Sequence, residues 1–175
     1  MDYIHYYESP LGTIVTASDG NALIGLWFED QKYFADTLGQ NYETKDLPVF
    51  VQTDIWLDIY FRGRDPGFLP PIAMRTTAFR KSVWKIMLQI PFGKTMTYGQ
   101  IAEEIARSKG LSHMSAQAVG GAVGHNSISL IIPCHRVVGS DGSLTGYAGG
   151  IDKKIQLLRM EGADMASMYI PRGRI

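Results

Sequence analysis

The chain is poor in the features of secreted and membrane-embedded proteins. Cys134 is the only cysteine among 175 residues, so an internal disulfide framework is excluded and a reducing compartment is expected. No apolar run approaches the ~20 residues that span a bilayer, and no signal peptide opens the chain. We therefore expect a cytoplasmic protein of one or two compact domains, without a membrane partner.

The sequence also lacks a net charge, which at first argues against a nucleic-acid partner. The two halves differ, however. Residues 1–74 contain 4 Lys+Arg and 11 Asp+Glu (4 − 11 = −7), and residues 75–175 contain 13 and 6 (13 − 6 = +7). A basic half beside an acidic one suits a DNA-facing domain joined to one that faces away. Chance segregation of solvated faces is the alternative interpretation.

The first half predicts a small α/β domain. Its short runs of β-branched and aromatic residues, separated by turn residues, predict an antiparallel meander of Tyr3–Tyr7, Gly12–Ser18 and Ala22–Phe28. A short helix is expected at Asp30–Leu38, and helical spacing of apolar residues predicts another at Val49–Phe61. We find no chemistry in this half.

Glycine and proline in residues 67–71 mark a domain boundary, which gives predicted domains of residues 1–71 and 72–175. The second domain opens with a helix that Thr77 can cap. Thr97 and Gln100 form a capping box for the next helix, and Ser115 can cap a third at residues 116–124. Strands are expected around Gly139–Tyr147, and a last helix at about Asp152–Met160.

The chemistry of this chain is concentrated at its one cysteine, which a histidine follows directly. A thiolate is the nucleophilic form of cysteine, so Cys134 would need a proton acceptor such as His135 close by. Adjacency in sequence does not establish contact, and lone cysteines are commonly small buried hydrophobes. The dipeptide by itself leaves both interpretations open.

The surrounding motifs resemble the O6-alkylguanine-DNA alkyltransferases, also called methylated-DNA–protein-cysteine methyltransferases. The resemblance runs from about Thr76 to Gly162, and the first 75 residues share it only weakly. Its motifs follow the order of the family, namely Gly93-Lys94-Thr95-Met96-Thr97-Tyr98-Gly99, Ala118-Val119-Gly120-Gly121-Ala122, Ile132-Pro133-Cys134-His135-Arg136-Val137 and Gly146-Tyr147-Ala148-Gly149-Gly150. It implies an α+β protein in which a small antiparallel-sheet α/β domain precedes a winged helix-turn-helix domain.

The resemblance also implies a set of catalytic residues. Cys134 would accept the alkyl group, and His135 would take the thiol proton through a water while Glu161 orients the imidazole. Asn126 matches the asparagine that binds the turn before the cysteine, and Tyr98 matches a tyrosine that protonates the guanine ring. Taken alone, Glu161 would be a solvated carboxylate and Tyr98 a core phenol.

Further matches imply a base pocket. Val123 matches a position in the wall of this pocket, and Tyr147 with Ala148 and Gly149 matches the loop that closes it. Small residues in that loop would leave room for bulky alkyl groups. No cofactor is implied, since the lesion carries its own transferable group. Some relatives hold a zinc ion in the N-terminal domain, but one cysteine and scattered histidines predict no metal here.

The third predicted helix of the second half, rich in alanine and glycine, matches the family's recognition helix. Ala116, Gln117, Gly120, Arg136 and Ser140 are the residues that the resemblance places at DNA, although Arg136 suits a structural role equally well. The family has an arginine at the position of Gln117, where it fills the space left by an extruded base. We expect Gln117 to keep this role with weaker support. An ordinary exposed glutamine, and close packing of the glycines on a neighbouring helix, are the alternatives.

These matches predict single-use repair of O6-alkylguanine, and of O4-alkylthymine as a further candidate substrate, in double-stranded DNA by a monomer. The alkyl group would pass directly to Cys134 as a thioether, which has no easy route back to thiolate. Two other classes of protein fit parts of the sequence. A lesion sensor would bind without reacting, and a thiol hydrolase would turn over and require an oxyanion hole.

Overall fold

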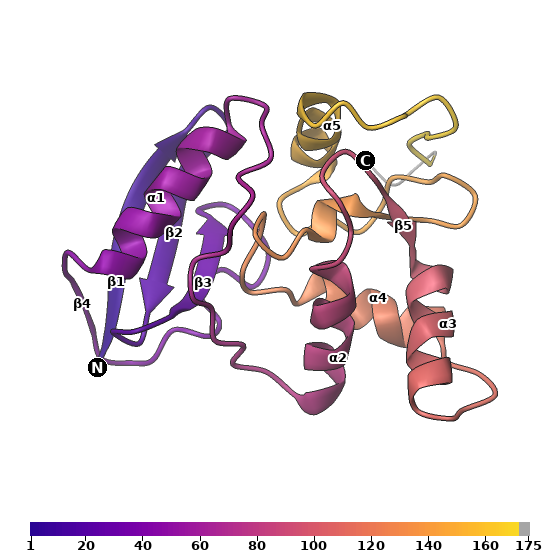
Figure 1. The fold of residues 1–175 in the computed structure, drawn as a ribbon, viewed down its shortest axis with the longest axis horizontal. Coiled ribbons are helices and arrows are strands. Elements are labelled where there is room, and N and C mark those ends of the chain that lie inside the picture. The colour runs from indigo at the N-terminus through magenta and orange to yellow at the C-terminus, as the bar shows by residue number, and fades with distance from the viewer. Residues whose placement is uncertain (172–175) are drawn as a thin grey trace. The chain divides into compact units, whose positions relative to one another are not determined.

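The computed structural model describes residues 1–171 and divides them into two compact units (Figure 1). Unit 1 comprises residues 1–75 and 127–131, and unit 2 comprises residues 76–126 and the described chain from Ile132 onward. A linear division of the sequence misses the return of residues 127–131 to unit 1. The predicted second domain extends to residue 175, and its last four residues lie outside the described part.

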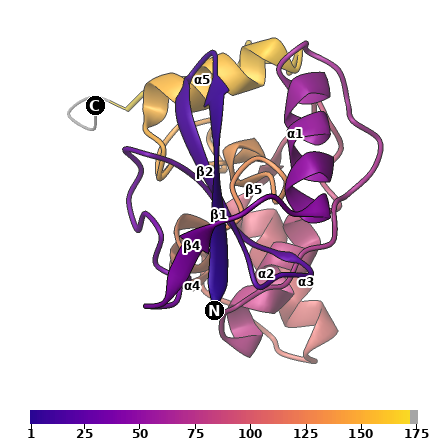
Figure 2. The same cartoon turned by 90° about the vertical axis from the view of Figure 1, so that its left-hand side faces the viewer.

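A four-stranded sheet in the order β3-β2-β1-β4 forms unit 1. β1 (Asp2–Ser9), β2 (Gly12–Ser18) and β3 (Leu23–Phe28) run antiparallel in sequence order, which confirms the predicted meander. The sequence analysis missed β4 (Tyr42–Thr44), a short strand that pairs in parallel with β1 (Figure 2).

The returning segment continues this sheet beyond β3. Leu26 N donates to the Ser127 carbonyl at 2.8 Å, and Ser129 N donates to the Leu26 carbonyl at 2.9 Å. The predicted helix of this half is confirmed as α1 (Pro48–Tyr60), which buries Phe50, Trp56 and Leu57. Proline at its first position suits a helix start, because an N–H there would have no helical acceptor.

The helix expected at Asp30–Leu38 does not form, and this prediction was wrong. The segment makes successive turns, in which Tyr33 and Ala35 have left-handed φ angles of 58° and 57°. Thr37 Oγ1 also donates to the Ile24 carbonyl at 3.0 Å, which ties the segment to β3. Such backbone angles interrupt a right-handed helix, and local hydrogen bonds replace the helical ones.

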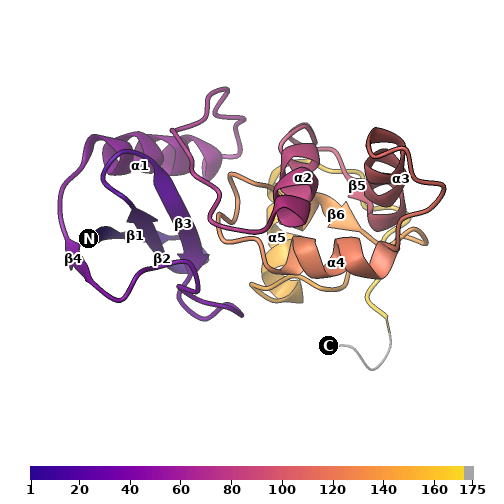
Figure 3. The same ribbon diagram turned by 90° about the horizontal axis from the view of Figure 1, so that it is seen from below.

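Three helices form the body of unit 2, namely α2 (Ala78–Met87), α3 (Tyr98–Ser108) and α4 (Ala116–Gly124). α4 packs against both of the others (Figure 3). The buried Trp84 of α2 donates through Nε1 to the Ala122 carbonyl of α4 at 2.8 Å. This arrangement confirms the predicted helix-turn-helix.

Side-chain caps start each of these helices where the sequence predicts them. Thr77 accepts from Arg80 N at the start of α2, and Ser115 accepts from Ala118 N at the start of α4. At α3 the full capping box is present, with Gln100 N donating to Thr97 Oγ1 at 3.0 Å and Thr97 N donating to Gln100 Oε1 at 2.8 Å.

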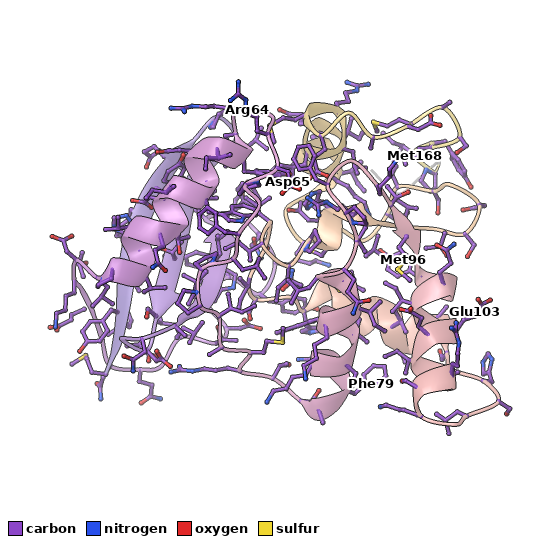
Figure 4. All side chains as sticks on the ribbon, viewed as in Figure 1. Arg64, Asp65, Phe79, Met96, Glu103 and Met168 are labelled. Carbon is purple, nitrogen blue, oxygen red and sulfur yellow. The ribbon has the colours of Figure 1, made fainter. Side chains whose placement is uncertain are left out.

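The remaining elements of unit 2 are short. β5 (Met96–Thr97), which includes the Met96 labelled in Figure 4, pairs in parallel with β6 (Val137–Val138). The strands expected around Gly139–Tyr147 were predicted wrongly, because this segment is a loop that makes one isolated bridge, from Ser143 to Tyr169. The last predicted helix is confirmed as α5 (Ile151–Met160). Within residues 1–171, no helix is both long enough and apolar enough to cross a bilayer.

We predict that Thr97→Ala destabilises unit 2 by about 1 kcal/mol, because it removes the acceptor that satisfies Gln100 N at the start of α3. Chemical denaturation followed by circular dichroism measures this change. Ser112→Ala, at an exposed serine in the turn between α3 and α4, is the matched control and should leave the unfolding midpoint unchanged. Equal midpoints for both variants would contradict the assignment.

Candidate active site

Cys134 lies in a single turn of 3-10 helix, Cys134–Arg136, that follows Pro133. The turn closes through Arg136 N, which donates to the Pro133 carbonyl at 3.0 Å. Asn126 holds the chain just before it, since Nδ2 donates to the Ile132 carbonyl at 2.7 Å, as the sequence analysis expected. Cys134 and His135 are both buried. The cysteine is therefore presented by a constrained turn.

Glu161, at the C-terminal end of α5, ties this turn to the rest of unit 2. Its Oε2 accepts from His135 Nε2 at 2.6 Å and its Oε1 from Arg136 Nε at 2.8 Å. Oε1 also accepts from Gly93 N, at 3.0 Å. The predicted contact between His135 and Glu161 is present, and the carboxylate accepts from the loop after α2 as well.

Electrostatics fix the protonation states of this pair. Burial acts to raise the pKa of Glu161, but hydrogen bonds from His135 and Arg136 outweigh it and hold that pKa well below its usual range. Burial lowers the pKa of His135, and the charges of Arg136 and Lys154 lower it further. We therefore assign an ionised carboxylate beside a neutral imidazole.

This assignment also selects the tautomer of His135. An ionised carboxylate only accepts hydrogen bonds, so the Nε2 that faces Glu161 must carry the proton. In a neutral imidazole the other nitrogen, Nδ1, then holds a lone pair and acts as a base. The geometry thus supplies a proton acceptor one residue from the thiol.

Arg136, for which the sequence analysis left both a DNA contact and a structural role open, has internal partners. Besides the contact through Nε, its Nη2 donates to Glu161 Oε2 at 3.1 Å and its Nη1 donates to the Ile90 carbonyl at 2.8 Å. Its side chain is 10% exposed. A buried carboxylate needs a cation, and Arg136 supplies it, which favours the structural role over the DNA contact.

Two tyrosines stand near the thiol. Burial, with a smaller contribution from Cys134, raises the pKa of Tyr98 to about 12, and its hydroxyl donates to the Thr145 carbonyl at 3.3 Å. Tyr147 packs edge-on to the His135 ring with centroids 6.4 Å apart. Its buried hydroxyl finds no hydrogen-bond partner among the residues that the structure describes. Such a group can donate to a ligand that enters the site.

Lys154 is a functional candidate that the sequence analysis missed. It is fully buried on α5, and Nζ donates to the carbonyls of Val137 at 2.6 Å and Thr145 at 3.0 Å. Burial lowers its pKa to about 8, while the charge of Cys134 acts to raise it. A signal was present, because Lys154 lies one helical turn from Leu157 and Leu158 on the apolar face of α5.

The face of α4 beside this site is open. Together with Tyr98 and the loop after β6, it lines a cavity of about 600 Å³, whose walls are Tyr98, Ala116, Gln117, Gly120, Gly139, Ser140, Asp141, Ser143, Thr145 and Gly146. A Cβ built on Gly121 or Gly124 would meet no heavy atom within 4 Å. Packing on a neighbouring helix therefore does not require these two glycines, and a Cβ on Gly120 would only just reach Tyr98 of α3, at 4.0 Å.

Other residues predicted for the base pocket are not among those that line this cavity. Val123 is buried in α4, and Ala148 and Gly149 are half-buried in the loop that precedes α5. Cys134 is not among the lining residues either, and it is 5% exposed. Within residues 1–171, no group of three or more His, Cys, Asp and Glu residues is placed to hold a metal ion.

Comparisons with known proteins agree with these features over most of the chain. Residues 3–73 match the family model of the 6-O-methylguanine DNA methyltransferase ribonuclease-like domain, and residues 78–163 match the model of its DNA-binding domain. The methylated-DNA–protein-cysteine methyltransferase of Haemophilus influenzae is 38% identical over 91% of this chain and 86% of its own. The protein of the same name from Mycobacterium tuberculosis is 40% identical over 90% and 92%.

A solved structure is also similar. The crystal structure of Mycobacterium tuberculosis OGT in complex with DNA superposes with a TM-score of 0.78 at 34% identity. The match covers 94% of this chain and 98% of that one.

The charge assignment predicts how stability depends on pH. Between pH 7 and 5 the unfolded chain takes up a proton on His135, whose ordinary pKa is 6.5, while the native imidazole with its lowered pKa does not. Stability should therefore fall in this window, by at most about 1.4 kcal/mol per pH unit for one proton. Below the ordinary value of 4.5, Glu161 with its depressed pKa should add to the loss.

Denaturant titrations at each pH measure this slope. His135→Gln should flatten it between pH 7 and 5 and leave the loss below pH 4.5 in place. The assignment of a neutral His135 would be refuted by identical slopes for both proteins above pH 5.

Proposed function

Since the chain belongs to the 6-O-methylguanine DNA methyltransferase family, we propose that it repairs DNA by direct reversal, moving the alkyl group of O6-alkylguanine onto Cys134. The reaction is that of a methylated-DNA–[protein]-cysteine S-methyltransferase, used once per molecule. The observation that carries this proposal is the buried hydrogen bond between His135 Nε2 and Glu161, which holds the imidazole of the residue next to the protein's only thiol.

Activation of the thiol follows from this arrangement. His135 Nδ1 accepts the proton of Cys134 through a water, and Glu161 stabilises the imidazolium that results. Asn126 keeps the turn in place through the Ile132 carbonyl. The buried ammonium of Lys154 favours the thiolate, because Cys134 and Lys154 interact electrostatically. Each of these groups lowers the cost of forming the nucleophile.

The atoms of the transfer balance without a cofactor. The sulfur attacks the alkyl carbon, a C–S bond forms, and the bond from that carbon to guanine O6 breaks. The departing guanine carries a negative charge until it takes up a proton from solvent, and the imidazolium of His135 releases the proton that it took from Cys134, so the protons balance. Tyr98 donates a hydrogen bond to the ring as this charge develops. A thioether does not return to a thiolate under cellular conditions, so the protein is consumed.

The alkylated base must approach a buried sulfur. We propose that it enters from the cavity beside Tyr98 and that the loop carrying Tyr147, Ala148 and Gly149 moves to admit it. Positive φ angles of 75° at Gly146 and 98° at Gly150 stand at the two ends of this loop, where glycine permits large backbone changes. Val123 would support the wall of the base pocket from α4.

Double-stranded DNA is the partner that the open face of α4 favours. Ala116, Gln117, Gly120 and Ser140 line the cavity and would lie in the minor groove or at its phosphates. The net charge of +7 in residues 75–175 also favours DNA as the partner of this half of the chain. One structural relative was crystallised in complex with DNA. A small apolar helix face discriminates little between sequences, as a lesion-directed protein requires.

We propose in addition that the protein works as a monomer in the cytoplasm. A reducing compartment keeps the single thiol available for reaction.

Intact-mass spectrometry tests the proposed function directly. The protein is mixed with a duplex that contains one O6-methylguanine, and with a matched duplex that contains guanine. We expect one added methyl group, stoichiometric with protein, on Cys134 only and with the modified duplex only. Cys134→Ala should stay unmodified while still binding the duplex.

Two outcomes would replace the proposal. Tight, lesion-specific binding without a mass change would indicate a sensor. Repeated turnover of a thiol-hydrolase substrate without accumulation of an adduct would indicate a hydrolase.

Gln117 provides a second test, of base extrusion. Its side chain is exposed at the cavity, where it can stack in the space left by the base and hydrogen-bond to the orphaned partner. Gln117→Ala should slow alkyl transfer from duplex by roughly 5- to 30-fold, and Gln117→Arg should speed it. Transfer from a single-stranded oligonucleotide should change much less, because there is no duplex to open.

Rapid-quench measurement of methylated protein gives these rates. Gln52→Ala, at an exposed glutamine of α1, is the matched control. An unchanged rate on duplex for Gln117→Ala would assign Gln117 as an ordinary surface residue.

A further inference from the structure

The segment after α5 completes the loop that follows β6. Leu144 N donates to the Tyr169 carbonyl at 2.8 Å, and Tyr169 N donates to the Gly142 carbonyl at 3.1 Å. The Tyr169 hydroxyl donates to a carboxylate oxygen of Asp141. One residue of the C-terminal segment thus contacts three positions of the loop, Asp141, Gly142 and Leu144, where the sequence analysis expected strands.

Close packing shows that this contact is built into the fold. A Cβ at Gly142 would lie 2.1 Å from the Ser167 carbonyl oxygen, and Gly142 has a φ of 89°. Any other side chain there would force the two segments apart. Met168, labelled in Figure 4, packs with Met165 against the buried cluster of Val138, Leu144 and Leu158. The segment is therefore anchored at the residues that directly precede Tyr169.

The loop that Tyr169 holds forms one wall of the cavity. Asp141 and Ser143 line that cavity together with Tyr98 and Gln117. One end of the loop, at Thr145, is held independently of Tyr169, because the Thr145 carbonyl accepts from Tyr98 and Lys154. The other end, at Asp141 and Gly142, which we call the outer end, is held by contacts within the loop and by Tyr169.

The charge of Asp141 makes the binding of DNA sensitive to how this outer end is held. A carboxylate repels phosphates, and here it lies at the rim of the surface that would receive DNA. The Tyr169 hydroxyl and Ser143 N bind the carboxylate, which lowers the pKa of Asp141 and keeps it ionised in a fixed position. A loop released from Tyr169 would present this charge in many orientations.

We propose that Tyr169 is a positioning residue for DNA, which acts through Asp141 to hold the outer wall of the cavity in the form that receives the duplex. This inference rests on the proposed function, since it concerns the same surface. It predicts a role in binding rather than in the chemical step, because the groups around Cys134 make no contact with Tyr169 in the described interactions.

Single-turnover alkylation over a range of duplex concentrations separates the parameters. Tyr169→Phe should raise the duplex concentration for half-maximal rate by roughly three- to tenfold, the effect of one lost hydrogen bond. The limiting rate and the fraction of protein that reacts should stay as in the wild type. Tyr6→Phe is the matched control, at a tyrosine that is 55% exposed against 46% for Tyr169.

A second variant tests whether the effect passes through the carboxylate. In an Asp141→Asn background, which removes the charge, Tyr169→Phe should change the half-maximal concentration less than twofold. An unchanged half-maximal concentration in Tyr169→Phe alone would overturn the proposal. A loss confined to the reactive fraction or the limiting rate would overturn it as well, as would equal effects in both backgrounds. Failure of the proposed function would look different, because the wild type itself would acquire no methyl group.

Discussion

One buried carboxylate organises the second unit of this protein. Glu161 accepts hydrogen bonds from the loop after α2, through Gly93 N, and from both residues that follow Cys134. It therefore joins the end of α5, that loop and the 3-10 turn at a single point. Removing one partner of such a buried pair costs about 3–5 kcal/mol, because the remaining charge stays in a medium of low polarity. The position of the thiol depends on this junction.

The site meets two opposed electrostatic requirements at once. The carboxylate must stay ionised while the imidazole bound to it stays neutral, although ionised Glu161 by itself would favour a protonated His135. Two buried cations resolve this conflict. Arg136 shares the carboxylate with His135, and Lys154 adds positive charge on the thiol side. The same cations favour the thiolate of Cys134. They therefore help both to keep His135 neutral, as the base, and to ionise Cys134, the nucleophile.

Local signals in the sequence predicted much of this fold, and tertiary contacts account for the rest. The meander and the capping box at Thr97 depend on neighbours in sequence, and both are present. The turns of residues 30–38 and the loop of residues 139–147 depend on contacts with segments that are distant in sequence, such as the contact of that loop with Tyr169. No local pattern reveals these contacts. At the site, motif resemblance predicted the contact of His135 with Glu161. It left Arg136 open between a DNA contact and a structural role, because a motif does not show whether a charged side chain is buried.

The central claim is that His135 is a neutral base whose proton resides on Nε2. Nitrogen-15 NMR of protein labelled at histidine, with His135→Gln for assignment, measures this at pH 7. We predict a resonance for Nε2 that carries a directly bonded proton and one for Nδ1 typical of a lone-pair nitrogen. An imidazolium, or a neutral ring with its proton on Nδ1, would contradict the account, because His135 could then accept no proton from Cys134 through Nδ1.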